Sequence, residues 1–449
     1  MPRVKLLMTI AIAVIAPVLI FLAAPSSMAA ESNSESAVAP GTVINHQNWR
    51  NFRQYMPDSM QTLWQGNTFW HLPADATIVI GPTGPIPSPN FFRAATEKNQ
   101  GTSSFKQLPD AGYITQNYRG GTPYPNPLKG NPAMAGERIY WDMYYRYHPR
   151  VEGAVCAFRS LDSYGNKSRL DIEDVYSQLS FVTDPGFPPT DPNAGPYYYT
   201  TMAEQIAPEA GKYTTTLILE PTDPTAEWEL YAFIPTLRRS LRLSQSARCA
   251  PVFGTDLTND DMFSGPPGLP QLFSIKYLGT KKILTMFHAN KGCFDSLGGA
   301  SDGDPKYFFP GGKGELFFLK PACGDWELRD VYVLSLKRLP AYAPGYCYGN
   351  RVIYVDQQNY YPDYVDLYDP NMKLFKGLMV FLMPNKIPGA PGQLSLNISS
   401  SDAILANFQD KHASLLECLP SCTDRGCDSK GYEDATRWAV PEGLMKIMQ

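Results

Sequence analysis

The sequence predicts a mainly β protein built on a large, curved antiparallel sheet with a few amphipathic helices on its concave side. Runs rich in β-branched and aromatic residues, cut by Gly, Pro, Asn and Asp, dominate the chain after about residue 112. No long helical segments separate these runs, which argues against a parallel sheet with crossover helices. Polar turns at 356–359 and 369–372 separate three strand-like runs, a pattern typical of an up-and-down sheet.

The predicted strands and helices follow from local periodicity. Short helices are expected at 49–56, at 58–64 and at 90–99, because apolar residues recur there at spacings of three and four. Asp58 or Ser59 is the expected N-cap of the second helix. The predicted strand runs are 138–148, 168–182, 212–221, 227–235, 237–247, 273–288, 315–321, 326–338, 351–369 and 374–384.

The N-terminus carries the features of a secretory signal. Arg3 and Lys5 precede an apolar run, and small residues then allow cleavage after Ala29. A membrane anchor is the alternative, but Pro17 interrupts the apolar run. The first cysteine is Cys156, so no lipid anchor is expected. We therefore expect an exported, periplasmic protein whose signal peptide is cleaved.

Three regions are expected along the chain. Residues 1–29 are the signal peptide, and 30–45 form a polar tether without periodicity. Residues 46–449 form a single β domain with a cysteine-rich C-terminal tail. The chain has 43 acidic and 39 basic residues and a formal net charge of −4, which argues against nucleic acid as a partner.

Eight cysteines in an exported chain point to disulfide bonds, because the periplasm and the extracellular space oxidise thiols. The spacing does not determine which cysteines pair. Cys418, Cys422 and Cys427 lie close to His412 and offer zinc as the alternative. Their C-x3-C and C-x4-C spacings differ from the C-x2-C of structural zinc sites, and disulfides are the preferred interpretation.

Catalytic motifs are weak, and the protein is not expected to be an enzyme. Ser301 lies in a G-x-S-x-G match, but neither the preceding strand nor the following helix of a nucleophile elbow is evident. The carboxylate pairs Asp260/Asp261 and Asp171/Asp174 could serve acid–base chemistry only inside a cleft.

Phosphate, metal and cofactor sites find no support either. The segment 309–315 lacks the spacing of a phosphate-binding loop and is predicted to be a hairpin turn. The five histidines are scattered without paired spacing, so no metal or cofactor is expected.

A hydrophobic small molecule or lipid is the expected partner, held between the concave face of the sheet and the helices. Apolar residues on both faces of the predicted strands support this hypothesis; ordinary core packing is the alternative. The predicted ligand-lining residues are Trp228, Leu230, Ile234, Leu237, Arg239, Leu241, Leu243, Val352 and Tyr354.

The segment 237–249 is unusually rich in arginine. By strand alternation Leu237, Leu241 and Leu243 share one face, whereas Arg238 and most polar residues share the other. Arg239 breaks the alternation, because it falls on the leucine face. The segment is therefore predicted to be a strand whose arginines meet solvent or the head group of a lipid.

The order of these segments resembles a known family. The sequence blocks at 231–243, 254–265, 277–284, 326–338 and 348–377, with the helical opening 52–67 and 91–99, are similar to the bacterial family called domain of unknown function 1329. The resemblance implies a LolA/LolB-like fold, an open half-barrel of antiparallel strands with helices on its concave side. It also implies an envelope role beside RND-type transporters and outer-membrane proteins.

Three functional hypotheses remain at this point. The preferred one is a periplasmic, non-enzymatic binder or carrier of a lipid, acyl chain, sterol or hydrocarbon. The second is a structural adaptor of an envelope RND-type transporter. The third is an exported lipid or glycan hydrolase that uses Ser301 or the pair Asp260/Asp261.

Overall fold

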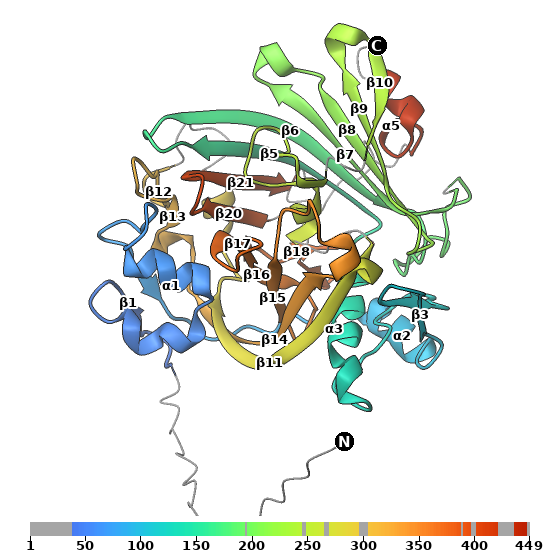
Figure 1. Ribbon diagram of the computed structural model, residues 1–449, viewed down its shortest axis with the longest axis horizontal. Helices are drawn as coiled ribbons and strands as arrows, with labels where there is room; N and C mark the ends of the chain where they lie inside the picture. Colours follow the sequence, from blue (N-terminus) through green and yellow to red (C-terminus); the bar gives the residue numbers. More distant parts are fainter. Residues whose placement is uncertain are drawn as a thin grey trace, which may run out of the picture. The chain divides into compact units, whose positions relative to one another are not determined.

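The computed structural model describes residues 38–193, 195–244, 248–264, 269–295, 304–387, 389–396, 401–420 and 435–446. Its central element is a 13-stranded sheet (Figure 1) in which neighbouring strands are antiparallel. The spatial order of the strands is β10 (Arg239–Leu243), β9 (Glu229–Ile234), β8 (Thr215–Pro221), β7 (Tyr197–Ala207), β6 (Lys167–Gln178), β5 (Val151–Leu161), β21 (His412–Pro420), β20 (Ser401–Asn407), β17 (Leu374–Leu382), β16 (Pro362–Tyr368), β15 (Asn350–Asp356), β14 (Glu327–Arg338) and β11 (Phe273–Thr285).

The sheet consists of two meanders joined in the middle. Strands β5 to β10 follow one another outward to one edge, and the chain then crosses to β11 at the opposite edge. From there β14, β15, β16, β17, β20 and β21 lead back until β21 pairs with β5. Because β10 and β11 are not paired with each other, the sheet is open. The predicted fold class is confirmed.

The remaining elements are short. Four two-stranded sheets pair β1 (Val43–Ile44) with β2 (Ile78–Val79), β3 (Ser104–Gln107) with β4 (Tyr113–Gln116), β12 (Phe308–Phe309) with β13 (Phe318–Leu319), and β18 (Asn385–Lys386) with β19 (Leu394–Ser395). The α-helices are α1 (Asp58–Gln65), α2 (Asn90–Lys98), α3 (Ala135–Tyr144), α4 (Lys291–Asp295) and α5 (Ala435–Trp438). The 3-10 helices include η1 (Trp49–Tyr55), η4 (Pro235–Leu237), η6 (Asn259–Ser264) and η12 (Pro441–Lys446). None of the helices within the described ranges combines the length and the apolar character that a membrane crossing requires.

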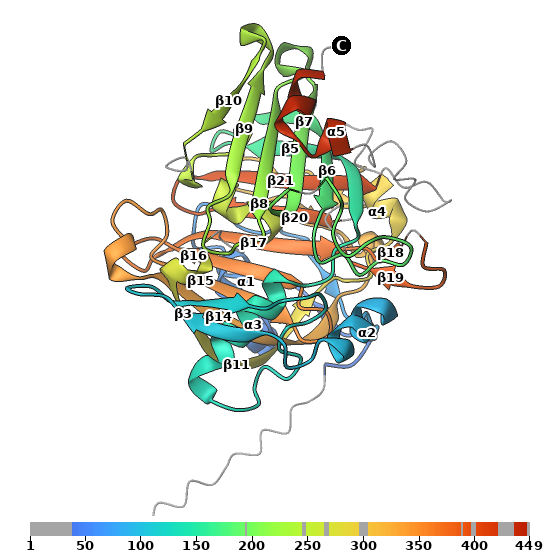
Figure 2. The ribbon, with the colours of Figure 1, turned by 90° about the vertical axis from the view of Figure 1, so that its right-hand side faces the viewer.

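Helix α3 defines the concave face, because it lies against β11 and β14 (Figure 2) and its Tyr144 also reaches β7 and β8 of the other meander. Gly136 packs against the backbone of β11, while the Tyr144 hydroxyl donates a 2.5 Å hydrogen bond to Glu220 on β8. The Tyr144 ring also lies 6.0 Å from that of Tyr198 on β7. The sheet must therefore curve around a helix that the sequence did not predict, whereas the helix predicted at 58–64 lies on the other face.

Helix α1 covers the opposite, convex face. Met60, Leu63 and Trp64 belong to a core cluster that includes Met379 and Ile404 of the sheet. The helix begins at Asp58 with Pro57 as its N-cap, and no side chain of its own caps it.

The N-terminal N–H groups of α1 are satisfied from the sheet instead. The backbone N–H groups of Asp58 and Ser59 donate to the Asp366 carboxylate of β16 at 2.9 and 3.1 Å. The predicted local cap is therefore wrong, because a distant carboxylate satisfies the free N–H groups of the first turn.

The run 138–148 was predicted to be a strand, and this prediction is wrong. Residues 135–144 form α3, whose side chains are buried on nearly every face. The helix buries its charged residues Glu137 and Asp142 together with its apolar ones, and its aromatic residues Tyr140, Trp141 and Tyr144 are of a type common in strands.

The other long predicted strands are confirmed, including the three-strand meander of β15, β16 and β17. The run 315–321 contributes only the two residues of β13, and its pairing with β12 confirms the predicted hairpin at 309–315. Strands β5, β7, β20 and β21 were not predicted. Burial on both faces removes the alternation from β5 and β20, and β21 lies in the segment interpreted as a tail.

The prediction of disulfide bonds is confirmed for six cysteines. The pairs are Cys156–Cys418, Cys249–Cys347 and Cys293–Cys323. The bond between Cys156 and Cys418 joins the two meanders, because it connects β5 to β21. Cys422 and Cys427 lie outside the described residues.

The close packing of α3 on β11 leads to a stability prediction. A Cβ atom at Gly136 would lie 2.7 Å from the backbone nitrogen of Tyr277 and 2.9 Å from the backbone oxygen of Ile275. We expect Gly136→Ala to lower the free energy of unfolding by about 1–3 kcal/mol in urea denaturation. Gly312→Ala is the control, because a Cβ there meets no atom within 4 Å. Equal stability of the two variants would contradict the close approach.

Candidate functional site

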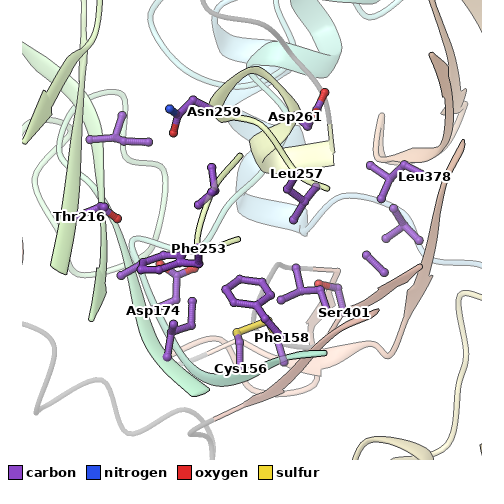
Figure 3. Close-up of a pocket in the computed structure, with 18 of the residues that line it drawn as sticks. Cys156, Phe158, Asp174, Thr216, Phe253, Leu257, Asn259, Asp261, Leu378 and Ser401 are labelled. Atoms are coloured by element: carbon purple, nitrogen blue, oxygen red, sulfur yellow. A yellow bond between two sulfur atoms is a disulfide. The ribbon is translucent and has the colours of Figure 1, made fainter. Parts of the chain in front are cut away.

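An apolar cavity lies on the concave face where the two meanders meet (Figure 3). It encloses about 840 Å³, part of which is open to solvent. The lining residues are Cys156, Phe158, Ile172, Asp174, Ala203, Thr216, Ile218, Val252, Phe253, Leu257, Asn259, Asp261, Tyr361, Leu378, Val380, Ser401, Ala403, Leu416 and Cys418.

The floor of the cavity consists of alternate residues on neighbouring strands. Cys156 and Phe158 of β5 point into it, and the residues between such positions point to the convex face. There Val175, Met202 and Leu217 pack in a core cluster with side chains of α5 and η12. Strand alternation therefore divides this half of the sheet into a filled convex face and a hollow concave face.

The Cys156–Cys418 disulfide lies in the floor (Figure 3). Its two cysteines are directly opposite each other in the register of β5 and β21. Both cysteines are almost completely buried. The disulfide therefore adds a covalent link across the pairing on which the cavity floor depends.

The roof comes from the segment that connects β10 to β11. Val252, Phe253 and Leu257 of this segment face the floor, and Tyr361, which precedes β16, joins them. The Phe253 ring stacks on that of Phe158, with centroids 6.1 Å apart and an interplanar angle of 25° (Figure 3). A crossing segment therefore closes part of the cavity from above.

Asp174 of β6 is a carboxyl group in this largely apolar wall. Burial raises its pKa to about 6, although the Thr201 hydroxyl donates a 3.0 Å hydrogen bond that favours the charged form. Asp171, its proposed partner in acid–base chemistry, is bonded at 2.7 Å to Arg169 on the same strand. The two carboxylates therefore do not act as a pair.

Asp260 and Asp261 hold the roof segment in place. Asp260 accepts hydrogen bonds from Arg248 at 2.9 Å and from the Tyr346 hydroxyl at 2.7 Å. Asp261 accepts from Arg351 at 3.0 Å and from Tyr348, whose hydroxyl lies 2.7 Å away. Both side chains are buried, and both are paired with an arginine and a tyrosine. We therefore interpret Asp260 and Asp261 as structural residues that anchor the roof segment.

The other candidates for chemistry are not assembled into a site. Ser301 lies outside the described residues. Cys418 is held in its disulfide, and His412 Nδ1 lies 2.5 Å from a carboxylate oxygen of Asp256. The part of the chain that the structure describes contains no group of three or more His, Cys, Asp or Glu side chains placed to hold a metal ion.

The residues predicted to line the ligand are distributed over both faces of the sheet, and none lines the cavity. Trp228, Leu230 and Leu243 pack beside Ile218, which does line it. Ile234, Arg239 and Leu241 lie on the same concave face nearer to the β10 edge, whereas Leu237 precedes that strand and is half exposed. Val352 and Tyr354 lie on the convex face with the α1 cluster. Contact of these residues with a ligand stays a prediction.

Sequence reasoning missed most of the cavity wall, since β5, β7, β20 and β21 were not predicted. One signal was present on β6. Ile172 and Asp174 occupy alternate positions of a predicted strand, and Asp174 had been noted only as a member of a carboxylate pair. A lone carboxyl group on the apolar face of a predicted strand was therefore a signal of the cavity wall.

The fold and the cavity define an open, curved antiparallel sheet with an apolar chamber on its concave side. Residues 43–418 match the family described as "Protein of unknown function (DUF1329)", and the chain belongs to this family. The predicted family is confirmed. No curated protein matches the chain.

Three solved structures match part of this chain. A DUF1329 family protein from Desulfovibrio piger has a TM-score of 0.43 and 12% identity, and the match covers 68% of this chain and 99% of that one. A domain described as an outer membrane lipoprotein-sorting protein, from Vibrio parahaemolyticus, has a TM-score of 0.42, 13% identity and coverages of 64% and 91%. A LolA superfamily protein from Nitrosomonas europaea has a TM-score of 0.34, 13% identity and coverages of 65% and 96%.

The raised pKa of Asp174 predicts a pH-dependent stability difference. Below about pH 3 the carboxyl is protonated in both folded and unfolded chains, and above pH 6 its ionisation costs the folded state at most about 3 kcal/mol. Asp174→Asn removes this cost and still accepts the hydrogen bond from Thr201. We therefore expect the variant to gain stability relative to the wild type as the pH rises from 4.5 to 7.5, measured by urea unfolding.

Asp162→Asn is the matched control for this experiment. The pKa of Asp162 is lowered by hydrogen bonds from Asn166 and neighbouring backbone groups, so its charged form stabilises the fold. We expect the stability of this variant relative to the wild type to stay nearly constant between pH 4.5 and 7.5, because Asp162 is ionised in both the folded and the unfolded chain over this interval. A pH-independent difference for Asp174→Asn would contradict the burial of that carboxyl.

Proposed function

We propose that the protein is a periplasmic, non-enzymatic binder or carrier of a hydrophobic ligand such as a lipid, acyl chain, sterol or hydrocarbon. The observation that carries this proposal is the mainly apolar lining of the cavity on the concave face. When an apolar ligand replaces water in an apolar cavity, the free energy of the system falls.

The energetics favour a large apolar ligand. Each buried CH₂ group contributes roughly 0.8 kcal/mol. Association costs at least about 4 kcal/mol in lost translational and rotational freedom. A short chain therefore binds weakly, and we expect a long alkyl chain or a polycyclic hydrocarbon.

Binding, rather than chemistry, also agrees with the state of the polar groups around the cavity. Asp261 is bonded to Arg351 and Tyr348, and Asp174 accepts a hydrogen bond from Thr201. These groups fix the wall and the roof, and the remaining surface is suited to apolar contact.

The cavity hypothesis is tested by filling it. Ala203 and Ala403 line the cavity from β7 and β20, and Phe at either position places a ring in the empty space. We expect delipidated Ala203→Phe or Ala403→Phe, incubated with a bacterial lipid extract, to retain at least tenfold less lipid than the wild type in native mass spectrometry.

Ala94→Phe is the control, because Ala94 is exposed on α2 away from the cavity. Circular dichroism establishes that each variant is folded before lipid is measured. Lipid retention by the filled variants at the wild-type level would remove the cavity as the binding site. A wild-type protein that retains no apolar molecule would overturn the proposal itself.

A carrier must exchange its ligand with another envelope component, and we propose an RND-type transporter or an outer-membrane protein as this partner. Cross-linking in intact cells followed by purification is expected to recover one such protein with the wild type. The same partner should be recovered with the lipid-free Ala203→Phe variant if the role is that of a structural adaptor. Recovery that depends on bound lipid supports the carrier, and the absence of any envelope partner contradicts this part of the proposal.

A further inference from the structure

The cavity continues as rows of side chains toward the β10 edge of the sheet. Ile218, which lines the cavity, is paired with Leu230 on β9, and Leu230 is paired with Leu243 on β10. A second row runs beside it from Thr216 through Ala232 to Leu241, with the same register. Residues paired across antiparallel strands share a face, so both rows lie on the concave side.

The convex side of the same strands is already covered. Phe233 of β9 packs with Trp438 and Leu444 in a core cluster. Helices α5 and η12, which carry these two residues, lie against this end of the sheet in both ribbon views (Figures 1 and 2). The concave rows are therefore the apolar surface that remains partly open here, and Leu241 and Leu243 are only half-buried.

Positive charge stands at the outer end of these rows. Arg239 is paired with Ile234 and shares its face with Leu241 and Leu243, and it is exposed. Within the described part of the chain neither Arg239 nor the adjacent Arg238 forms an ion pair or a hydrogen bond through its side chain. An exposed guanidinium with unused donors is suited to a carboxylate or phosphate.

A carboxyl group stands at the inner end. Asp174 is paired with Ala203, and Ala203 with Thr216, so the second row begins at an acidic side chain inside the cavity. Like charges repel strongly in an apolar chamber. An anionic group would therefore avoid the inner end and be attracted to the outer one.

We propose that the ligand is an anionic amphiphile, whose alkyl chain lies along these rows into the cavity and whose head group binds Arg239 at the β10 edge. The inference rests on the proposed function and adds the class of ligand and its orientation. The observation behind the inference is that the two rows of apolar side chains, called the apolar track below, have a positive charge at their outer end and a negative charge at their inner end.

The length of the track agrees with this assignment. Strands lie about 4.8 Å apart, so the distance from β5 to β10 is about 24 Å along the sheet. One leaflet of the hydrocarbon core of a bilayer, which is filled by single acyl chains, is about 15 Å thick. A full-length acyl chain therefore fits between the disulfide in the floor and the arginine at the edge.

The test compares ligands that share a chain and differ in the head group. Palmitate and hexadecanol, and lysophosphatidylglycerol and lysophosphatidylcholine with the same acyl chain, are titrated into delipidated protein and followed by tryptophan fluorescence. We expect the wild type to prefer the anionic member of each pair. A preference in both pairs assigns recognition of negative charge in general, and a preference in one pair assigns a carboxylate or a phosphate.

Arg239→Gln is expected to weaken binding of the preferred anionic ligand about three- to tenfold and to change binding of its neutral analogue less than twofold. Arg242→Gln is the matched control, because Arg242 lies on the opposite face of the same strand, 3.4 Å from Glu229. Raising the salt concentration should reduce the preference of the wild type for the anionic over the neutral ligand, and it should leave the same preference in Arg239→Gln unchanged.

The outcomes separate the two proposals. Binding of neutral and anionic ligands with equal affinity, or an equal loss in Arg239→Gln and Arg242→Gln, overturns the assignment of the head group and leaves the hydrophobic carrier standing. Binding of neither class by the wild type overturns the carrier as well.

Discussion

The pairing of β21 with β5 is the interaction on which the rest of the structure depends. Each strand belongs to a different meander, and without the pairing both meanders would expose an unpaired edge in the middle of the sheet. The Cys156–Cys418 disulfide reinforces it across a sequence separation of 262 residues. Because the floor of the cavity takes residues from both sides of this junction, the chamber exists only when the two ends of the domain have come together.

The cavity stays open because other elements fill the rest of the concave face. Helix α3 occupies one part with its aromatic side chains, and the segment between β10 and β11 forms a roof held by buried ion pairs. Loss of one partner of such a pair leaves an uncompensated charge in the interior and costs about 3–5 kcal/mol. Arg351 therefore acts on the cavity indirectly: it fixes Asp261 and hence the height of the roof above the floor.

Local patterns predicted the strands that are dense in β-branched and aromatic residues, such as β14 and β15, although both faces of these strands are buried. They failed in other parts of the chain where burial is complete. The run 138–148 looks like a strand because it is rich in aromatic residues, and β5 and β20 show no alternation because both of their faces are covered. The C-terminal segment interpreted as a tail contributes the two central strands β20 and β21. Local sequence patterns could not predict this, because β21 pairs with β5, which lies far from it in the sequence.

The sequence by itself determined the antiparallel class, the oxidised cysteines and the position of Arg239 on the leucine face of β10. These properties depend on the period of side chains along a single strand and on the chemistry of thiols. Only the tertiary structure decided that Cys418 would meet Cys156, that Val352 and Tyr354 would face away from the cavity, and that Asp174 would stand in its wall. Those outcomes depend on which distant strands become neighbours, and that choice is made by the free energy of burying both faces of the sheet together.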